Sequence, residues 1–231
     1  MKKLLIGLLA LTSISTFADP CIIEGIPGAI RATLNCNGKT VPIEVNSDST
    51  GIYQEDTRSA MQNGEFFLLI GRAKRLIING KLAHESVSPG NFYPTFLIKL
   101  DSNLNPVLGT EFSPNAQTIP GGIVSMPTKL VAFGKGVAVL NYFEDLSHKE
   151  ISIFSAQNLT RFRGLPFKGY IQDNDIWVEQ NSLRIKFSIE KSYEENIYFN
   201  TINPYGFRYI YSYDLDNHGL GYVSKSPISV F

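Results

Sequence analysis

After residue 18, the apolar residues of the chain fall into short runs or alternate with polar residues. Leu183, Ile185, Phe187 and Ile189 are separated by single polar residues, which is the two-residue period of a strand with one buried face. The continuous apolar run from Phe66 to Ile70 has the length of a strand that is buried on both faces. Because no segment here carries a helical apolar stripe over three turns, the pattern predicts an all-β protein of antiparallel strands.

Shorter apolar runs bounded by Gly, Asn and Pro turn signals predict further strands. They lie at 22–23, 29–34, 40–45, 75–78, 92–100, 129–133, 137–143 and 150–154. One short helix is expected at 52–63, with Asp56 or Thr57 as its cap and Asn63-Gly64 as its end. Residues 103–122 hold three prolines and a Gly-Gly pair, so we expect a long loop or an internal break there.

A strand-like run that ends in a polar turn recurs four times along the chain. The turns begin at Asn46, Asp101, Ser155 and Asp214, at spacings of 54 to 59 residues. Such a spacing leaves room for about four strands of 5–6 residues with their turns. Four units of this kind predict the blades of a small β-propeller. The alternative is a β-sandwich or a barrel, because strands and turns alternate in any antiparallel protein.

The first 18 residues follow a different pattern. Two lysines precede an apolar run at 4–11, and small or weakly polar residues lead up to Ala18. This is the order of a secretory signal peptide, and the apolar run is shorter than the about 20 residues needed to cross a bilayer. We expect residues 1–18 to be removed and residues 19–231 to fold as the all-β domain. The mature protein is then periplasmic or extracellular and has no integral membrane segment.

The chain has two cysteines, Cys21 and Cys36, both near the expected mature N-terminus. Outside the cytosol such a pair forms a disulfide, and neither close spacing nor neighbouring histidines favour a metal or redox site. In the loop-entropy model, closing a loop of this size stabilises the fold by about 3 kcal/mol. The bridge is expected to join the first two strands.

Composition excludes some functions. The chain has 21 basic and 21 acidic residues, and without a basic stripe it is not expected to bind nucleic acid or an anionic membrane surface. Phe, Tyr and Trp make up 12% of the residues, which is ample for a packed core. There are only three histidines and no Gly-x-Ser-x-Gly elbow. No catalytic residue, cofactor or metal is therefore predicted.

Aromatic residues supply the candidate ligand-binding positions. Tyr205, Tyr209, Tyr211 and Tyr213 lie two or four residues apart in an alternating segment, so they share one face of a predicted strand. Together with Trp177 they offer flat apolar area with polar edges, which suits a sugar or a protein partner. Cross-strand packing of the aromatic rings is the alternative interpretation.

Acidic residues give a weaker signal for calcium. Asp214 and Asp216 resemble the opening of an oxygen-ligand loop, but Lys225 stands at the twelfth position, where a bidentate Glu is required. The alternative is a plain turn, since Asp and Asn bond to their own backbone there.

Together these features predict an exported, non-catalytic binding or interaction module for a protein or carbohydrate ligand. A secreted carbohydrate hydrolase is one alternative, with Asp173, Asp175 and Glu179 near Trp177 as candidate acids. A small outer-membrane β-barrel is the second alternative. The terminal Phe231 permits it, but the positions two, four and six residues earlier are Ser, Pro and Lys, which is not the apolar alternation of a lipid-facing strand.

Overall fold

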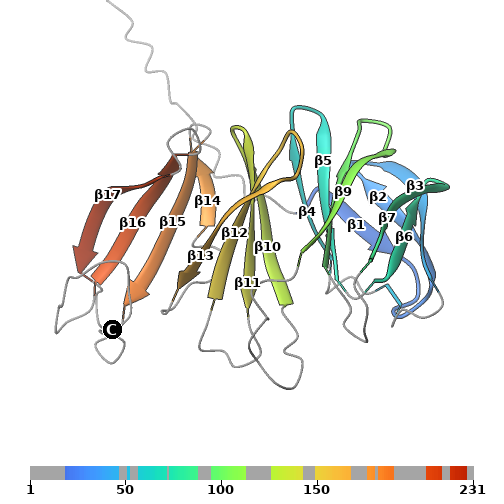
Figure 1. The fold of residues 1–231 in the computed structure, drawn as a ribbon, viewed down its shortest axis with the longest axis horizontal. Helices are drawn as coiled ribbons and strands as arrows, with labels where there is room; N and C mark the ends of the chain where they lie inside the picture. The colour runs from blue at the N-terminus through green and yellow to red at the C-terminus, as the bar shows by residue number, and fades with distance from the viewer. Residues whose placement is uncertain are drawn as a thin grey trace, which may run out of the picture.

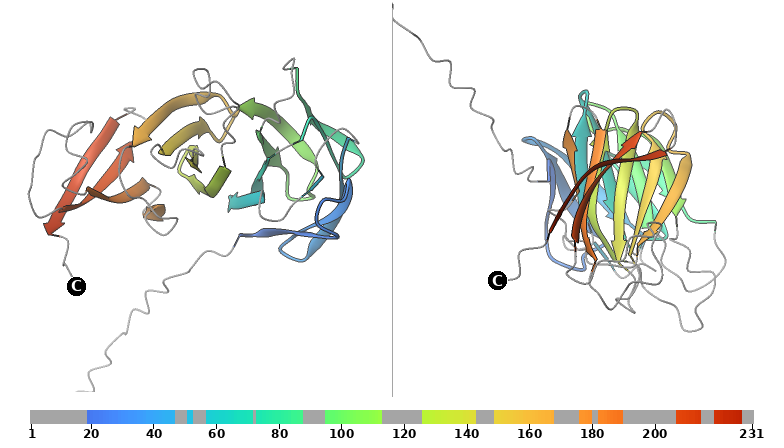
Figure 2. Two further views of the ribbon diagram at one scale, coloured as in Figure 1. Left: turned by 90° about the horizontal axis from the view of Figure 1, so that it is seen from below. Right: turned by 90° about the vertical axis from the view of Figure 1, so that its left-hand side faces the viewer.

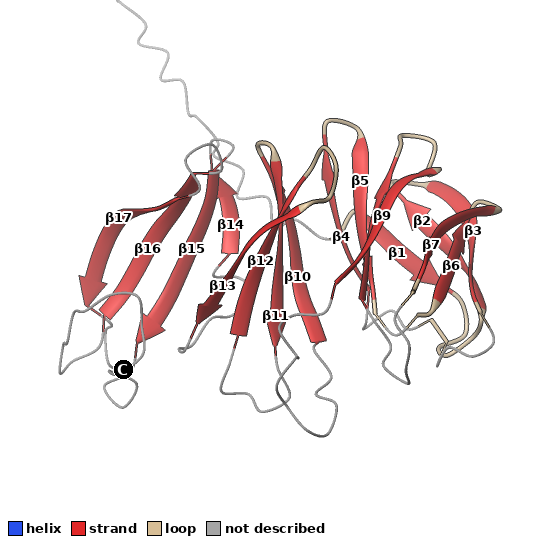
Figure 3. Ribbon diagram, viewed as in Figure 1, coloured by secondary structure: helices blue, strands red, loops and turns tan. Residues whose placement is uncertain are grey.

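The computed structural model describes the chain from residue 19 to residue 227, with gaps. The described ranges are 19–46, 51–52, 57–71, 73–87, 95–112, 126–142, 149–167, 176–179, 182–189, 207–214 and 219–227. Every regular element in these ranges is a strand, and all strand pairs are antiparallel (Figure 3). The predicted all-β class is confirmed. The predicted signal, residues 1–18, lies outside the described residues.

The described strands form four separate sheets. Sheet 1 has the order β1 (Cys21–Glu24), β2 (Arg31–Cys36), β3 (Lys39–Val45), β6 (Arg75–Ile78) and β7 (Lys81–Glu85). Sheet 2 has the order β4 (Thr57–Gln62), β5 (Glu65–Ile70), β8 (Thr95–Leu100) and β9 (Pro106–Phe112). Sheet 3 has the order β10 (Met126–Phe133), β11 (Gly136–Tyr142), β12 (Lys149–Ser155) and β13 (Arg161–Phe167). Sheet 4 has the order β14 (Ile176–Glu179), β15 (Ser182–Ile189), β16 (Phe207–Asp214) and β17 (Gly219–Pro227).

The four sheets stand side by side in chain order (Figure 1). Seen from below they make an arc that is open between sheet 1 and sheet 4, and the first strand of each sheet lies on its concave side (Figure 2). These first strands, β1, β4, β10 and β14, each contact the next one along the arc. None of the sheets closes on itself as a barrel does. Closure into a ring of propeller blades stays a prediction.

The four predicted turn positions occupy one equivalent place in the sheets. Asn46 directly follows β3 and Asp101 directly follows β8, while Ser155 and Asp214 are the last residues of β12 and β16. Each of these strands is the third in the order of its sheet. The spacing read from the sequence therefore reflects four successive sheets of similar build.

Sheets 2 and 3 also share a turn with a left-handed leucine. Leu104 and Leu159 have φ values of 62° and 56°, and both follow an asparagine, 55 residues apart. The amide of Leu104 donates to the Asp101 carbonyl, and that of Leu159 donates to the Ser155 carbonyl. Both leucine side chains are buried, one in each of two apolar clusters. The turn thus places a core residue at the same end of both sheets.

The two apolar clusters lie between sheets 1 and 2 and between sheets 2 and 3. Phe66, Leu68 and Ile70 of β5 join residues of sheet 1 in the first cluster, whereas Phe67 and Leu69 join residues of sheet 3 in the second. Burial of one such side chain contributes about 1.5–3 kcal/mol. Because sheet 2 is covered on both faces, β5 needs apolar residues at every position, which explains its continuous apolar run.

One hairpin of sheet 1 is inserted in the chain between two strands of sheet 2. The chain leaves sheet 2 after β5, adds β6 and β7 to the edge of sheet 1, and returns as β8. Strand β9 then packs closely against β7, and a Cβ atom at Gly109 would collide with the Ala83 carbonyl oxygen. The first two sheets are therefore interlocked rather than simply consecutive.

The prediction of a helix at 52–63 is wrong, because Thr57–Gln62 forms strand β4. Asn63 and Gly64 have φ values of 53° and 78° and make the two-residue turn to β5. An Asn-Gly pair suits a hairpin as well as a helix end, and here pairing with the apolar β5 decides the outcome.

The expected long loop at 103–122 is corrected in its first half, since Pro106–Phe112 forms strand β9. Strand β9 is an edge strand whose first residue is Pro106, a position where a missing N–H does no harm. Residues 113–122 lie outside the described ranges.

Candidate functional site

The predicted disulfide between Cys21 and Cys36 is confirmed. Their sulfur atoms lie 2.11 Å apart, and the two residues are direct partners in the register of β1 and β2. Both side chains are buried. The bridge therefore ties the edge strand of sheet 1 to its neighbour, as expected.

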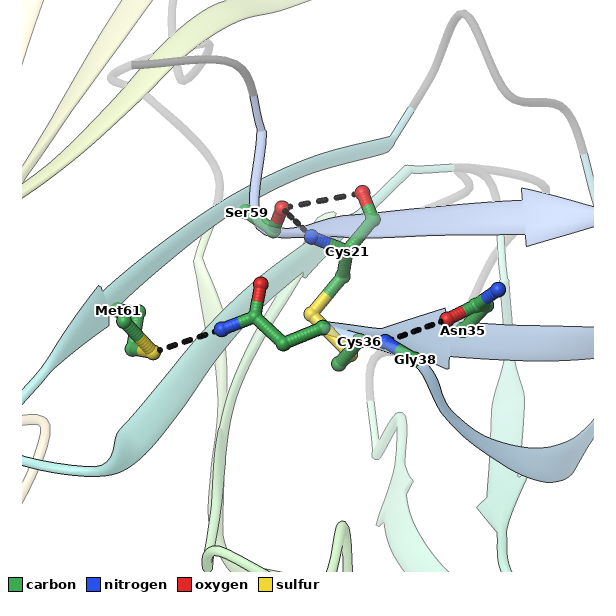
Figure 4. The surroundings of a disulfide bond; sticks show 7 residues. Cys21, Asn35, Cys36, Gly38, Ser59 and Met61 are labelled. Atoms are coloured by element: carbon green, nitrogen blue, oxygen red, sulfur yellow. Dashed lines mark hydrogen bonds between the residues drawn. A yellow bond between two sulfur atoms is a disulfide. The ribbon is translucent and has the colours of Figure 1, made fainter. Parts of the chain in front are cut away.

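Sheet 2 holds the same edge strand through a serine. The Ser59 hydroxyl accepts a hydrogen bond from the Cys21 amide at 2.9 Å and donates one to the Cys21 carbonyl at 3.2 Å (Figure 4). Ser59 lies on β4 and is buried. A second contact joins the two sheets nearby, where the Asn37 amide donates to the sulfur of Met61 at 3.2 Å. This region therefore joins sheets 1 and 2, and the Ser59 hydroxyl, the Asn37 side chain and the Met61 sulfur all take part in hydrogen bonds there.

The candidate ligand-binding residues do not gather on one face of sheet 4. Tyr211 pairs with Ile185, which also pairs with Ile176, so these positions share a face. Trp177 pairs with Arg184 and belongs to the opposite face. Tyr205 lies outside the described residues.

The tyrosine positions of β16 lie on the more apolar face of sheet 4. Tyr213 pairs with Leu183, whose side chain is fully buried, and Tyr209 pairs with Phe187. The register therefore places these tyrosine positions on the same face of sheet 4 as the buried Leu183.

The acidic candidates are only partly described. Asp214 ends β16 and its backbone pairs with Gly219, while Asp216, Asp173 and Asp175 lie outside the described residues. Within the described ranges, no group of three or more His, Cys, Asp or Glu side chains is arranged to hold a metal ion. The described part of the chain contains no helix that is long and apolar enough to span a bilayer.

The turns at the equivalent positions of sheets 2 and 3 use their polar side chains internally. The Asp101 carboxylate accepts hydrogen bonds from the amides of Asn103 and Asn105 at 2.8 and 2.9 Å. The hydrogen bond from the backbone amide of Asn105 is the main reason that the pKa of the Asp101 carboxyl lies below its ordinary value. The Ser155 hydroxyl accepts from the amide of Gln157 at 3.2 Å. In sheets 2 and 3, the polar residue at the start of each turn therefore accepts hydrogen bonds from backbone amides of the same turn.

A different group of polar residues meets between sheets 2 and 3. Strand β8 begins and strand β11 finishes at one end of this interface, and we call it the polar end. Its residues are Arg58, Thr95, Thr128, Asn141 and Ser152. Asn141 follows Val137 and Val139 in the alternation of β11, and both valines belong to the cluster between these sheets. The amide of Asn141 therefore faces sheet 2.

A β-bulge shapes this end. The pairing of β10 with β11 shifts between Pro127 and Lys129, so Thr128 is an extra residue next to Asn141, the partner of Pro127. The Arg58 Nε atom donates to the Thr128 carbonyl at 2.8 Å. Another guanidinium nitrogen donates to the Thr57 carbonyl at 2.7 Å. Bulges of this kind redirect side chains and are frequent beside functional sites.

Three side-chain atoms at the polar end are buried without a hydrogen-bond partner. They are Oδ1 and Nδ2 of Asn141 and Oγ1 of Thr128. Asn141 is 0% exposed. Leaving a buried polar group unpaired costs about 1–3 kcal/mol, so each such group in a folded protein calls for an explanation.

The opposite end of the same interface shows the contrast. The Lys99 ammonium is 2.9 Å from a Glu65 carboxylate oxygen and donates to the Ala156 carbonyl at 3.1 Å. The Gln62 side chain donates to the Gly134 carbonyl at 2.9 Å. These polar side chains join sheets 2 and 3 and each has a partner. The side chains of Lys99 and Gln62 thus differ from those of Asn141 and Thr128 at the polar end.

Sequence reasoning missed the polar end, although one signal pointed to it. Asn141 stands at a core-facing position of an otherwise apolar alternation with Val137 and Val139. An amide at such a position must find a partner when buried. Thr128 and Arg58 gave no comparable signal, because only the bulge and the packing of β4 against β10 bring them to Asn141.

Comparison with known proteins gives no family. No family model and no curated protein matches the chain. Among solved structures, the apo form of AztD from Citrobacter koseri is similar at 10% sequence identity and a TM-score of 0.31, over 91% of this chain and 70% of that chain. A likeness of this size assigns neither a family nor a function.

Proposed function

We propose that the protein is an exported module that binds a ligand and catalyses no reaction. The observation that carries the binding role is the set of unpaired buried atoms on Asn141 and Thr128. A bound molecule that supplies donors and acceptors there removes the cost of leaving them unpaired. The polar end lies between two sheets of a firmly packed array, and a rigid support of this kind holds a binding site in its working geometry.

Two observations support export. Residues 1–18 have the pattern of a signal peptide. The Cys21–Cys36 bridge is buried and in strand register, and disulfides persist in oxidising compartments outside the cytosol. The ligand is proposed to be a protein or a carbohydrate, and the near balance of basic and acidic residues speaks against nucleic acid.

The proposal that the protein is exported is tested on protein recovered from the native host. Intact-mass measurement is expected to show a chain that begins at Asp19 and has lost two hydrogens, with no thiol that reacts before reduction. A chain that keeps residues 1–18, or that carries two free thiols, contradicts export.

The binding half is tested by thermal unfolding of the purified protein with a library of saccharides, amino acids, dipeptides and organic acids. A ligand that binds the folded state raises the midpoint by mass action. At least one class is expected to stabilise the wild type but not the Asn141→Leu variant. The matched control is Asn158→Ala, which alters an exposed turn residue at the other end of the same sheet. A library without any effect on the wild type contradicts a small-ligand binding role.

A further inference from the structure

We propose that Asn63 is a site of spontaneous deamidation, at which the side-chain amide is converted to a carboxylate without an enzyme. Within the described part of the chain, the Asn63-Gly64 turn has both reacting groups exposed and free of hydrogen bonds. The other two Asn-Gly turns hold theirs in hydrogen bonds. The site is inferred from these turns alone and does not depend on the proposed binding function.

The sequence contains three Asn-Gly pairs, and each one forms the two-residue turn of a hairpin. The turns share one backbone shape, with φ between 50° and 53° at the asparagines and between 72° and 81° at the glycines. Left-handed values at both positions are those of a type I′ turn. Because sequence and backbone are alike, a difference in reactivity must come from the surroundings of each turn. The turns are Asn37-Gly38 from β2 to β3, Asn63-Gly64 from β4 to β5, and Asn79-Gly80 from β6 to β7.

Deamidation begins with attack by the main-chain nitrogen of the glycine on the side-chain carbonyl carbon of the asparagine. The nitrogen gives up its proton, a new C–N bond closes a succinimide ring, and the bond to the side-chain nitrogen breaks to release ammonia. Water then opens the ring at either carbonyl and leaves aspartate or isoaspartate. Glycine favours the attack since it has no side chain to obstruct the ring. A hydrogen bond to either reacting group opposes the attack, because that bond must first be broken.

Both reacting groups of the first turn are hydrogen-bonded (Figure 4). The Asn37 side-chain nitrogen donates to the Met61 sulfur at 3.2 Å, which fixes the carboxamide. The Gly38 amide, whose nitrogen would attack, donates to Oδ1 of Asn35 at 3.1 Å. The first turn is therefore protected at the group that attacks and at the group that is attacked.

The third turn is fixed by its neighbours. The Asn79 side-chain nitrogen donates to Oδ1 of Asn105 at 3.1 Å, and the Asn79 main-chain amide donates to the Pro42 carbonyl at 2.8 Å. Asn79 is also partly buried, so solvent reaches it less readily. The carboxamide is therefore restrained from turning towards the nitrogen of Gly80.

The second turn has neither form of protection. Asn63 and Gly64 are both exposed, and a Cβ atom at Gly64 would find no neighbouring atom within 4 Å. No residue of the described ranges forms a hydrogen bond with the Asn63 side chain or with the Gly64 amide. The carboxamide is free to turn towards the glycine nitrogen, and solvent reaches both groups. Asn63 is therefore expected to react first of the three.

Modification at Asn63 would disturb the contact between sheets 2 and 3. The two-residue turn keeps Gln62 opposite Glu65, and isoaspartate lengthens the main chain of the turn by a carbon atom. Gln62 donates to the Gly134 carbonyl of sheet 3. Glu65 pairs with the Lys99 ammonium, which also donates to sheet 3. The deamidated protein is therefore expected to unfold at a lower urea concentration.

The test incubates the mature protein at mildly alkaline pH and body temperature, either folded and oxidised or reduced and unfolded in guanidinium chloride. Peptide mapping by mass spectrometry, with separation of aspartate from isoaspartate, gives the rate at each asparagine. Asn35→Ala frees the Gly38 amide, and Met61→Leu frees the Asn37 carboxamide if Asn35→Ala does not fold. Asn63→Gly is the matched control, because glycine suits the turn and cannot deamidate.

In the folded protein, Asn63 is expected to deamidate about tenfold faster than Asn37 or Asn79, since those two must first break hydrogen bonds. In the unfolded chain the three rates should be comparable. Asn35→Ala should speed the reaction of Asn37 several-fold and leave that of Asn63 unchanged. Incubation should lower the urea midpoint of the wild type but not that of Asn63→Gly.

Equal rates in the folded protein, or a faster reaction at Asn37 or Asn79 than at Asn63, overturn the inference. A similar lead of Asn63 in the unfolded chain traces the difference to sequence and overturns the structural explanation. An unchanged rate at Asn37 in both Asn35→Ala and Met61→Leu overturns the protection by hydrogen bonds. If Asn63 reacts first and the midpoint does not move, the site stands and its effect on the sheets is overturned.

Discussion

The hydroxyl of Ser59 is hydrogen-bonded to both backbone groups of Cys21, at 2.9 Å to the amide nitrogen and 3.2 Å to the carbonyl oxygen. One side chain of sheet 2 thus completes the backbone bonding of the edge strand of sheet 1, beside the disulfide that ties the same strand to β2. Strand β1 is therefore held by two separate links, one to β2 and one to β4.

Replacement Ser59→Ala is expected to destabilise the protein by about 1–3 kcal/mol, because it leaves two buried backbone groups of Cys21 without partners. Urea unfolding of the oxidised protein measures the change. Ser102→Ala, at an exposed turn, is the control and should leave the midpoint unchanged. Equal midpoints for wild type and Ser59→Ala would show that the serine bonds add nothing to stability.

Removal of the disulfide by Cys21→Ala with Cys36→Ala is expected to cost about 3 kcal/mol, since the bridge closes a loop with a sequence separation of 15 residues. Unfolding curves of the oxidised wild type, the reduced wild type and the double variant give the comparison. The reduced protein and the variant should agree with each other. A variant as stable as the oxidised protein contradicts this expectation.

Replacement of either left-handed turn leucine by Ala, at Leu104 or at Leu159, is expected to cost about 2–5 kcal/mol through lost burial and the cavity that remains. Alanine keeps the same backbone strain at positive φ, so the difference reports the side chain alone. The exposed Leu82→Ala is the control. Unfolding in urea measures all three, and losses below that of the control exclude a core role for these leucines.

Burial lowers the pKa of His84 below its ordinary value of 6.5, although the Glu111 carboxylate acts in the opposite direction. The imidazole packs edge-on against Phe96, with ring centres 4.8 Å apart. The unfolded chain therefore takes up a proton near pH 6.5 while the folded protein does not. Stability should be independent of this group above pH 6.5 and should fall as the pH drops from 6.5 towards the lowered value.

The contribution of His84 is isolated by measuring unfolding free energy against pH for the wild type and for His84→Gln. The variant should lose less stability between neutral and mildly acidic pH. Parallel curves would mean that His84 titrates alike in the folded and unfolded states.

Without ligand, Asn141→Leu is expected to leave stability unchanged or to raise it by about 1–3 kcal/mol, because an apolar side chain of similar size replaces a buried amide with no partner. Urea unfolding of the unliganded protein measures this. A loss of stability would mean that the amide is paired in solution.

Much of the fold could be predicted from short-range patterns. Alternation at 183–189 and the apolar runs at 66–70 and 75–78 correspond to β15, β5 and β6, because burial of one or both faces of a sheet selects the residues along each strand. Errors arose where one local signal serves two structures. Asn63-Gly64 ends a helix or turns a hairpin, and Pro106 suits a loop or the start of an edge strand.

The candidate site could not be predicted in the same way. Sequence reasoning chose aromatic residues of sheet 4, of which the register places Trp177 and Tyr211 on opposite faces. It missed Thr128 and Asn141, whose significance depends on a bulge and on which atoms find partners across two sheets. Hydrogen-bond satisfaction is a property of packed neighbours and has no fixed signature along the chain.

By itself, the amino-acid sequence determined the all-β class, the pairing of Cys21 with Cys36 and the four-fold spacing of the turns, because periodic burial and a single cysteine pair are local or unique features. Only the tertiary structure decided that β6 and β7 join sheet 1, that the sheets form an open arc, and that Arg58, Thr128 and Asn141 meet. These outcomes depend on contacts between residues far apart in the chain, where the free energy of packing selects among partners that are equally compatible with the local pattern.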